Sequence, residues 1–164
     1  GEQQANKISR QSSVRGTKIH GVCEDYLNNE ELNTEKLSFV ETDMFNNMRT
    51  YLDKIDNIHC IEQFLYSDHL RLAGQVDCIA EYEGKLSIID FKTSAKLKKK
   101  SYIKNYFAQC AAYAIMFEER TGVPITNSVI IIGVQDEEPQ LFVEHRDNYT
   151  EYLLECRDLY ENNA

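Results

Sequence analysis

The most constraining feature of this chain is a pair of apolar, strand-like segments joined by a tight turn within residues 74–93. Side chains of a strand point alternately to opposite faces, so Asp90 and Lys92 fall on one face of the second segment. The turn residues Glu83-Gly84 bring the first segment back antiparallel to the second. Asp77 can then lie across from Asp90, and the segment predicts a hairpin that gathers two carboxylates and a lysine.

This grouping of charges favours metal chemistry. Two neighbouring carboxylates repel each other unless a proton or a cation lies between them, and hard oxygen ligands favour Mg²⁺ or Mn²⁺. A lysine beside such a metal can position a water nucleophile or stabilise the charge that develops on a phosphate. The alternative interpretation is a solvated ion pair at the end of a buried strand, which is the usual meaning of an isolated Asp-x-Lys.

The surrounding motifs favour the first interpretation. The ordered set Gly74-x-x-Asp77, Asp90-Phe91-Lys92-Thr93 and Gln109-x-x-x-Tyr113 resembles the RecB-type exonuclease branch of the PD-(D/E)XK nuclease superfamily. Within that branch it is most similar to the mitochondrial genome maintenance exonucleases and their phage and bacterial relatives. Residues 15–20, continuing to Glu24, match the helix that carries a metal-binding histidine there, and Glu62 lies where those nucleases place a strand glutamate. The likeness covers roughly residues 15–113.

The resemblance implies an α/β fold with a mixed central β-sheet flanked by helices, the restriction-endonuclease-like core. It also implies a Mg²⁺- or Mn²⁺-dependent exonuclease that hydrolyses the phosphodiester bonds of DNA. The implied catalytic residues are Asp77, Asp90, Lys92 and Glu62, and the implied metal ligands are His20, Asp77, Asp90 and the Phe91 carbonyl. The implied substrate-binding residues are Arg15, Thr93, Lys96, Lys98, Gln109 and Tyr113. Glu24 would either contact a metal ligand or bind a second metal.

Several of these side chains also have a structural interpretation. His20 and Glu24 are four residues apart and share one helical face, where a lone histidine is more often hydrogen-bonded near the core. Glu62 can be an edge-strand glutamate that faces solvent. Gln109 and Tyr113 continue a stripe with Tyr102 and Tyr106, which can stack on unpaired bases or simply pack.

Around the hairpin, hydrophobic periodicity predicts helices over residues 14–28, capped by Ser12 or Ser13, and over 35–55, 101–121 and 146–161. Strands are expected over residues 58–66, 129–134 and 139–144. The length of 164 residues fits one nuclease domain, residues 1–164, in which residues 1–13 are expected to be a flexible N-terminal segment.

Composition indicates where the protein is located and which cofactor it is expected to lack. The sequence lacks an apolar run long enough for a membrane helix and an apolar signal core at its start, so we expect a soluble, intracellular protein without membrane partners. The lack of an Arg-rich leader favours the cytoplasm of a bacterium or a phage-infected host over a mitochondrion. Five cysteines without a Cys-x-x-Cys pair predict reduced thiols and no iron–sulfur cluster.

Charge distribution indicates the substrate. The net charge is −9, yet residues 85–117 contain seven lysines and one acid, a basic strip suited to a phosphate backbone. We expect single-stranded DNA as the preferred substrate, in replication, repair or recombination, where partner proteins from those processes can be expected. A structure-specific endonuclease on the same fold, or a nucleic-acid-binding module that has lost catalysis, are the alternatives. A small-molecule hydrolase is disfavoured by the lysine strip.

Overall fold

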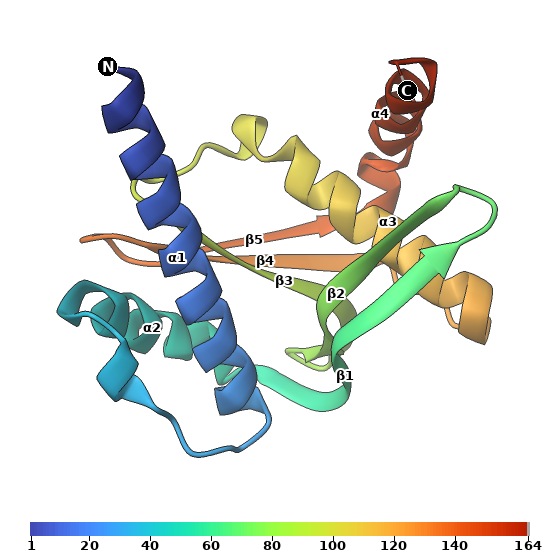
Figure 1. The fold of residues 1–164 in the computed structure, drawn as a ribbon. Coiled ribbons are helices and arrows are strands. Elements are labelled where there is room, and N and C mark those ends of the chain that lie inside the picture. The colour runs from blue at the N-terminus through green and yellow to red at the C-terminus, as the bar shows by residue number, and fades with distance from the viewer. Residues whose placement is uncertain (164) are drawn as a thin grey trace. The chain divides into compact units, whose positions relative to one another are not determined.

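A computed structural model of the chain describes residues 1–163 (Figure 1). The sheet has five strands in the order β1-β2-β3-β4-β5. The fold class predicted from the sequence, α/β with a mixed sheet and four α-helices, is confirmed. The elements are α1 (Glu2–Leu27), α2 (Phe39–Leu52), β1 (Ile55–Ser67), β2 (Leu72–Tyr82), β3 (Lys85–Ser94), α3 (Lys104–Thr121), β4 (Asn127–Val134), β5 (Gln140–His145) and α4 (Thr150–Asn163).

The chain divides into two compact units, each described by itself. The first, called here the α1 unit, contains residues 1–54, 91–98 and 131–141. The second, called the hairpin unit, contains residues 55–90, 99–130 and those from 142 onward. Strand β3 belongs to both, because its residues through Asp90 lie in the hairpin unit and those from Phe91 lie in the α1 unit.

Helix α1 is longer than the sequence analysis predicted. It begins at Glu2, with Gly1 as N-cap, so the prediction of a start near Val14 capped by Ser12 or Ser13 is wrong. Its buried residues are confined to its second half, Ile19, Val22 and Cys23. Residues 2–13 are helical without an apolar face to signal it, which is why the periodicity did not find them.

Helix α2 begins with a complete capping box. The backbone N–H of Glu41 donates to the Ser38 hydroxyl, and the N–H of Ser38 donates to the Glu41 carboxylate. Its buried side chains include Met44, Phe45 and Met48, and the ring of Phe45 packs edge-on against Tyr26 of α1 with centroids 5.7 Å apart.

The hairpin unit is organised by two antiparallel ladders. Strands β1 and β2 pair from Ile55↔Tyr82 to Ser67↔Leu72, with a shift in register between Asp56 and Cys60. Strands β2 and β3 pair from Tyr82↔Lys85 to Cys78↔Ile89. The turn between them has positive φ at Glu83 (49°) and Gly84 (82°), as a tight hairpin requires. The predicted hairpin is therefore confirmed.

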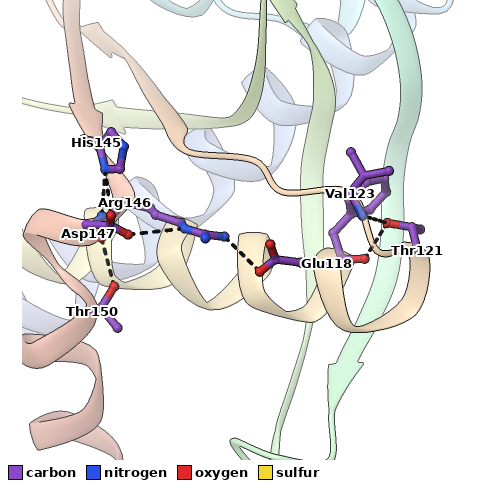
Figure 2. Close-up of polar contacts among 8 residues, drawn as sticks. Glu118, Thr121, Val123, His145, Arg146, Asp147 and Thr150 are labelled. Atoms are coloured by element: carbon purple, nitrogen blue, oxygen red, sulfur yellow. Dashed lines mark hydrogen bonds and ion pairs between the residues drawn. The ribbon is translucent and has the colours of Figure 1, made fainter.

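Helices α3 and α4 of the hairpin unit are joined by polar and aromatic contacts. Figure 2 shows Arg146, just before α4, reaching Glu118 of α3, with Nη1 3.3 Å from Oε2. The ring of Tyr149 stacks on Phe107 with centroids 4.8 Å apart. Helix α3 ends at Thr121, as predicted from the sequence, and its C-cap Gly122 has φ 75°. Across residues 1–163, no helix is both long and apolar enough to cross a membrane.

Candidate active site

The carboxylates of the predicted site are placed by the β2–β3 ladder. The last pair of that ladder is Cys78↔Ile89, so Asp77 and Asp90 are the next residues in line across the two strands. Asp90 is only 4% exposed, and Asp77 is half-buried. Two neighbouring carboxylates repel each other, so a pair of acids at this position favours a bound cation.

Tyr113 of α3 lies beside this acid pair. A Cβ built on Gly74 would lie 3.0 Å from Cε1 of Tyr113, so the absence of a side chain at Gly74 is what lets the ring approach β2. Burial, the largest cause, and the charges of Asp90 and Asp77 together raise the pKa of Tyr113 to about 12, although a hydrogen bond from Gln109 acts in the opposite direction. Tyr113 is therefore a phenol at neutral pH and can donate a hydrogen bond.

Gln109 and Tyr113 also contact each other directly. The Gln109 Nε2 group donates to the Tyr113 hydroxyl at 3.2 Å, one helical turn apart on α3. The two residues that the sequence analysis selected from the Gln-x-x-x-Tyr pattern thus form one polar unit beside Asp77 and Asp90.

The α1 unit supplies a second group of predicted residues. His20 of α1 lies with Nε2 2.8 Å from the carbonyl oxygen of Phe91, and the two rings meet edge-on with centroids 5.9 Å apart. Because a carbonyl oxygen only accepts, Nε2 carries the proton in this contact. Glu24 lies on the other side of the imidazole, with Oε1 3.7 Å from Nδ1. A carboxylate at that nitrogen is the usual way to orient a metal-binding histidine.

Lys92 and Thr93 follow Phe91 on β3 and are both half-buried. Helix α1 passes close to this part of the strand, since a Cβ on Gly16 would lie 3.5 Å from the Thr93 hydroxyl. Asp90, Phe91 and Lys92 are consecutive, so the carboxylate, the carbonyl and the ammonium group are carried by one continuous stretch of backbone.

A match to a protein-family model identifies the superfamily of the chain that carries these carboxylates, the imidazole and the lysine. The model described as the PD-(D/E)XK nuclease superfamily matches residues 2–162. The chain belongs to this superfamily. Nucleases of the PD-(D/E)XK superfamily generally use divalent metal ions.

Individual relatives are more distant. The chain is 27% identical to mitochondrial genome maintenance exonuclease 1 of Mus musculus over 131 residues, and 28% identical to that of Xenopus tropicalis over 144 residues. These alignments cover 77% and 85% of this chain but only 38% and 41% of those proteins, so the chain spans about two fifths of the length of the curated relatives. The crystal structure of a candidate exonuclease from Eubacterium rectale matches 91% of this chain and 65% of its own, with a TM-score of 0.59 and 12% identity.

The donor set fits a divalent ion of the kind PD-(D/E)XK nucleases use. Two carboxylates and a carbonyl oxygen are hard ligands that suit Mg²⁺ or Mn²⁺, and the imidazole adds a softer nitrogen donor. Adjacent ligands around an octahedral Mg²⁺ lie about 2.9 Å apart, given metal–ligand distances of roughly 2.0–2.1 Å. The 2.8 Å between His20 Nε2 and the Phe91 oxygen matches that edge. Within residues 1–163, no three side chains of His, Cys, Asp or Glu converge as a group, so the structure brings the predicted ligands together in pairs.

Glu62 differs from the other predicted acids. It lies on the edge strand β1, is exposed, and has a positive φ of 54°. Extending the β1–β2 register places it opposite Asp77, between the pairs Ile61↔Cys78 and Gln63↔Val76. The side chain of Glu62 is therefore open to solvent, as in the alternative interpretation of the sequence, and its part in the site stays a prediction.

The basic residues predicted to bind substrate lie near the end of β3. Lys96 and Lys98 have exposed side chains, and the backbone N–H of Lys98 donates to Gln140 at 2.8 Å. Arg15 lines a pocket on α1 together with Arg10 and Lys18, which the sequence analysis did not select. The spacing of four between residues 10, 14 and 18 would have indicated this face, had the helix been predicted to start before Val14.

Proposed function

We propose that this chain is the catalytic part of a metal-dependent DNA exonuclease that hydrolyses phosphodiester bonds and prefers single-stranded DNA. The observation that carries the proposal is the run Asp90-Phe91-Lys92 on β3, with Asp77 next in register and His20 on the Phe91 carbonyl. Membership of the PD-(D/E)XK superfamily supports nuclease activity, and relatives named as genome maintenance exonucleases support action on DNA ends during replication, repair or recombination.

In this proposal Asp77, Asp90, the Phe91 carbonyl and His20 hold a Mg²⁺ or Mn²⁺ ion. When bound, the ion would act as a Lewis acid on the scissile phosphate and lower the pKa of the attacking water. Binding at His20 Nε2 would require the tautomer whose proton is on Nδ1, which the Glu24 carboxylate 3.7 Å away would stabilise electrostatically. Glu24 thereby fixes the imidazole in the orientation that ligation needs.

The remaining residues bind and orient the substrate. The Lys92 ammonium group, next to Asp90 along β3, positions the attacking water and stabilises the negative charge that develops on the phosphate. Tyr113 stays protonated and donates to a phosphate oxygen, with Gln109 holding its hydroxyl in place. Glu62 is open to solvent and completes the water structure around the ion. Thr93, Lys96 and Lys98 follow Lys92 along the chain and contact the DNA backbone.

The decisive experiment is digestion of end-labelled linear single-stranded DNA with Mg²⁺ or Mn²⁺. We expect metal-dependent shortening that EDTA and Lys92→Ala abolish. Lys85→Ala is the matched control, because Lys85 lies on the same strand with an exposed side chain and the variant removes the same charge. Folded protein that binds metal but leaves every substrate intact would refute the proposal and favour a binding module.

Two further substrates test whether the enzyme requires a DNA end and whether it prefers single-stranded DNA. Circular single-stranded DNA should resist digestion, because an exonuclease requires an end, and its cleavage would instead indicate an endonuclease. Blunt duplex DNA should be degraded more slowly than single-stranded DNA of the same sequence. Equal rates would remove the single-strand preference and leave the rest of the proposal intact.

A further inference from the structure

A basic pocket of about 580 Å³ lies in the α1 unit, formed by residues 8–18 of α1, the start of α2 and the residues that follow β3 and β4. Arg10, Arg15 and Lys18 line it, and Glu41 is its one carboxylate. Its other lining residues are Ile8, Gln11, Ser12, Val14, Ser38, Val40, Ala95 and Gln135. The side chains around the pocket therefore favour an anionic ligand.

The charges of the pocket are only partly neutralised. Glu41 lies 3.5 Å from Lys18 and also accepts the hydrogen bond of the α2 capping box from Ser38 at 2.8 Å. Arg15 is different, because its Nε atom is buried and has no hydrogen-bond partner among residues 1–163. A buried donor that is left unsatisfied is costly, and an anion bound beside Arg15 would remove that cost.

The pocket lies in line with the proposed metal site. Helix α1 runs along the end of β3, with His20 at Phe91, Gly16 at Thr93 and the Arg15 pocket at Ala95. Four residues of a helix span about 6 Å, and two residues of a strand span about 6.6 Å. Successive contacts between α1 and β3 therefore stay aligned along the strand. The pocket therefore lies about 13 Å from Phe91 along the strand.

We propose that this pocket binds a backbone phosphate of the DNA strand, two to four nucleotides from the phosphate that is cleaved. A stacked strand rises about 3.4 Å per nucleotide, so about 13 Å corresponds to four nucleotides, and to fewer in an extended strand. The inference rests on the proposed function, because that function places the scissile phosphate at Asp90 and Phe91. The inference adds a second phosphate contact away from the cleaved phosphate. This contact would set the length of strand that is needed for full binding affinity.

The test replaces single phosphates by uncharged methylphosphonates, one at a time, along a labelled single-stranded oligonucleotide. Binding is measured by fluorescence anisotropy in EDTA, so that cleavage is not required. We expect one sensitive position between the second and fourth linkage from the cleaved one, where the neutral group weakens binding to the wild type about 10-fold. In Arg15→Gln the same substitution should change affinity by less than a factor of about two, because the contact is already lost.

Two more variants separate loss of contact from loss of folding. Arg10→Gln alters an exposed side chain of the pocket, so it should fold and reduce the effect of the methylphosphonate at that position. Lys7→Gln is the matched control, because Lys7 is exposed on the same helix and does not line the pocket. Arg10→Gln and Arg15→Gln should each reduce by about one the slope of the log binding constant against the log salt concentration. Arg15→Lys keeps the charge, so its slope should lie nearer to that of the wild type.

The outcomes distinguish this inference from the proposed function. If the wild type cleaves single-stranded DNA yet tolerates the neutral linkage equally at every position beyond the cleaved one, the pocket does not bind phosphate. The same conclusion follows if Arg10→Gln, Arg15→Gln and Lys7→Gln weaken binding equally. If the folded protein neither binds nor cleaves DNA, the proposed function itself fails.

Discussion

The two parts of β3 present their functional groups by different means. Before the Asp90–Phe91 bond, the strand lies in the hairpin unit, where ladder pairing and the packing of Tyr113 on Gly74 place two acids. After that bond, it lies in the α1 unit, where a long helix runs beside the strand and contributes an imidazole and several cations. The first part carries a buried carboxylate, Asp90, whereas the second carries a half-buried lysine, Lys92.

This difference separates what local sequence determines from what tertiary packing determines. Asp77 and Asp90 are thirteen positions apart and are aligned by a tight turn, so their placement follows from the hairpin alone. His20 meets the Phe91 carbonyl across 71 positions of sequence. The acids should therefore tolerate changes in α1, whereas the imidazole contact depends on how α1 packs.

The largest expected effect distinguishes the acid pair from the imidazole. Asp90→Asn removes the buried charge that a metal requires and should lower the rate of DNA cleavage by about 10³-fold, which is about 4 kcal/mol. His20→Gln removes one neutral ligand and should cost about 10–100-fold, recoverable in part by raising the metal concentration. The measurement is single-turnover cleavage across a Mg²⁺ titration. If His20→Gln were as severe as Asp90→Asn at saturating metal, the two regions would not differ in this way.

The same contrast explains how much the sequence predicted. The hairpin and the end of helix α3 at Thr121 each depend on short-range signals, and both were predicted. The start of α1 was not predicted, because residues 2–13 are helical through the propensity of polar side chains and bury nothing. Arg10 was overlooked for that reason.

Glu62 was left with two interpretations, a site residue or a glutamate that faces solvent, for a different reason. Strict alternation along β1 assumes regular strand geometry, whereas Glu62 has a positive φ and an exposed side chain. A glutamate rarely adopts that backbone conformation, and its sequence gives no sign of it. The role of Glu62 therefore stays a prediction, which a Glu62→Gln variant in the cleavage assay would test.

The next prediction concerns the contact that holds Tyr113. Gly74→Ala would place a methyl group 3.0 Å from Cε1 and 3.2 Å from the hydroxyl oxygen of Tyr113. We expect a loss of about 1–3 kcal/mol in the free energy of unfolding, measured by urea denaturation. In a Tyr113→Ala background the same substitution should cost much less, because the clashing ring is gone. Equal costs in both backgrounds would show that the ring does not set the requirement for glycine.

Alkaline pH tests the electrostatics of the acidic region. The pKa of Tyr113 is about 12 in the folded state because of burial and the nearby Asp90 and Asp77, whereas an unfolded tyrosine has a pKa of about 10. Between these values the unfolded chain binds fewer protons, so stability falls as pH rises through the window. Between pH 10 and about 12 the wild type should lose on the order of 1–2 kcal/mol of its free energy of unfolding through Tyr113, and Tyr113→Phe should not show this loss.

The matched control for this pH effect is Tyr102→Phe, because the side chain of Tyr102 is 76% exposed. Urea denaturation of both variants and the wild type, below pH 10 and near pH 12, measures the difference. If the two variants lose the same stability over this range, Tyr113 does not ionise with the raised pKa that its burial predicts.

The smallest effect is expected in the α1 unit and has the opposite sign. Gly16 lies inside α1, and a Cβ there would meet only the Thr93 hydroxyl, at an ordinary contact distance of 3.5 Å. Gly16→Ala should therefore raise the free energy of unfolding by about 0.5–1 kcal/mol, the gain in helix propensity. Urea denaturation beside Gly74→Ala makes the comparison direct. If Gly16→Ala were as destabilising as Gly74→Ala, α1 would approach β3 as closely as Tyr113 approaches β2, and the two regions would be equally intolerant of added volume.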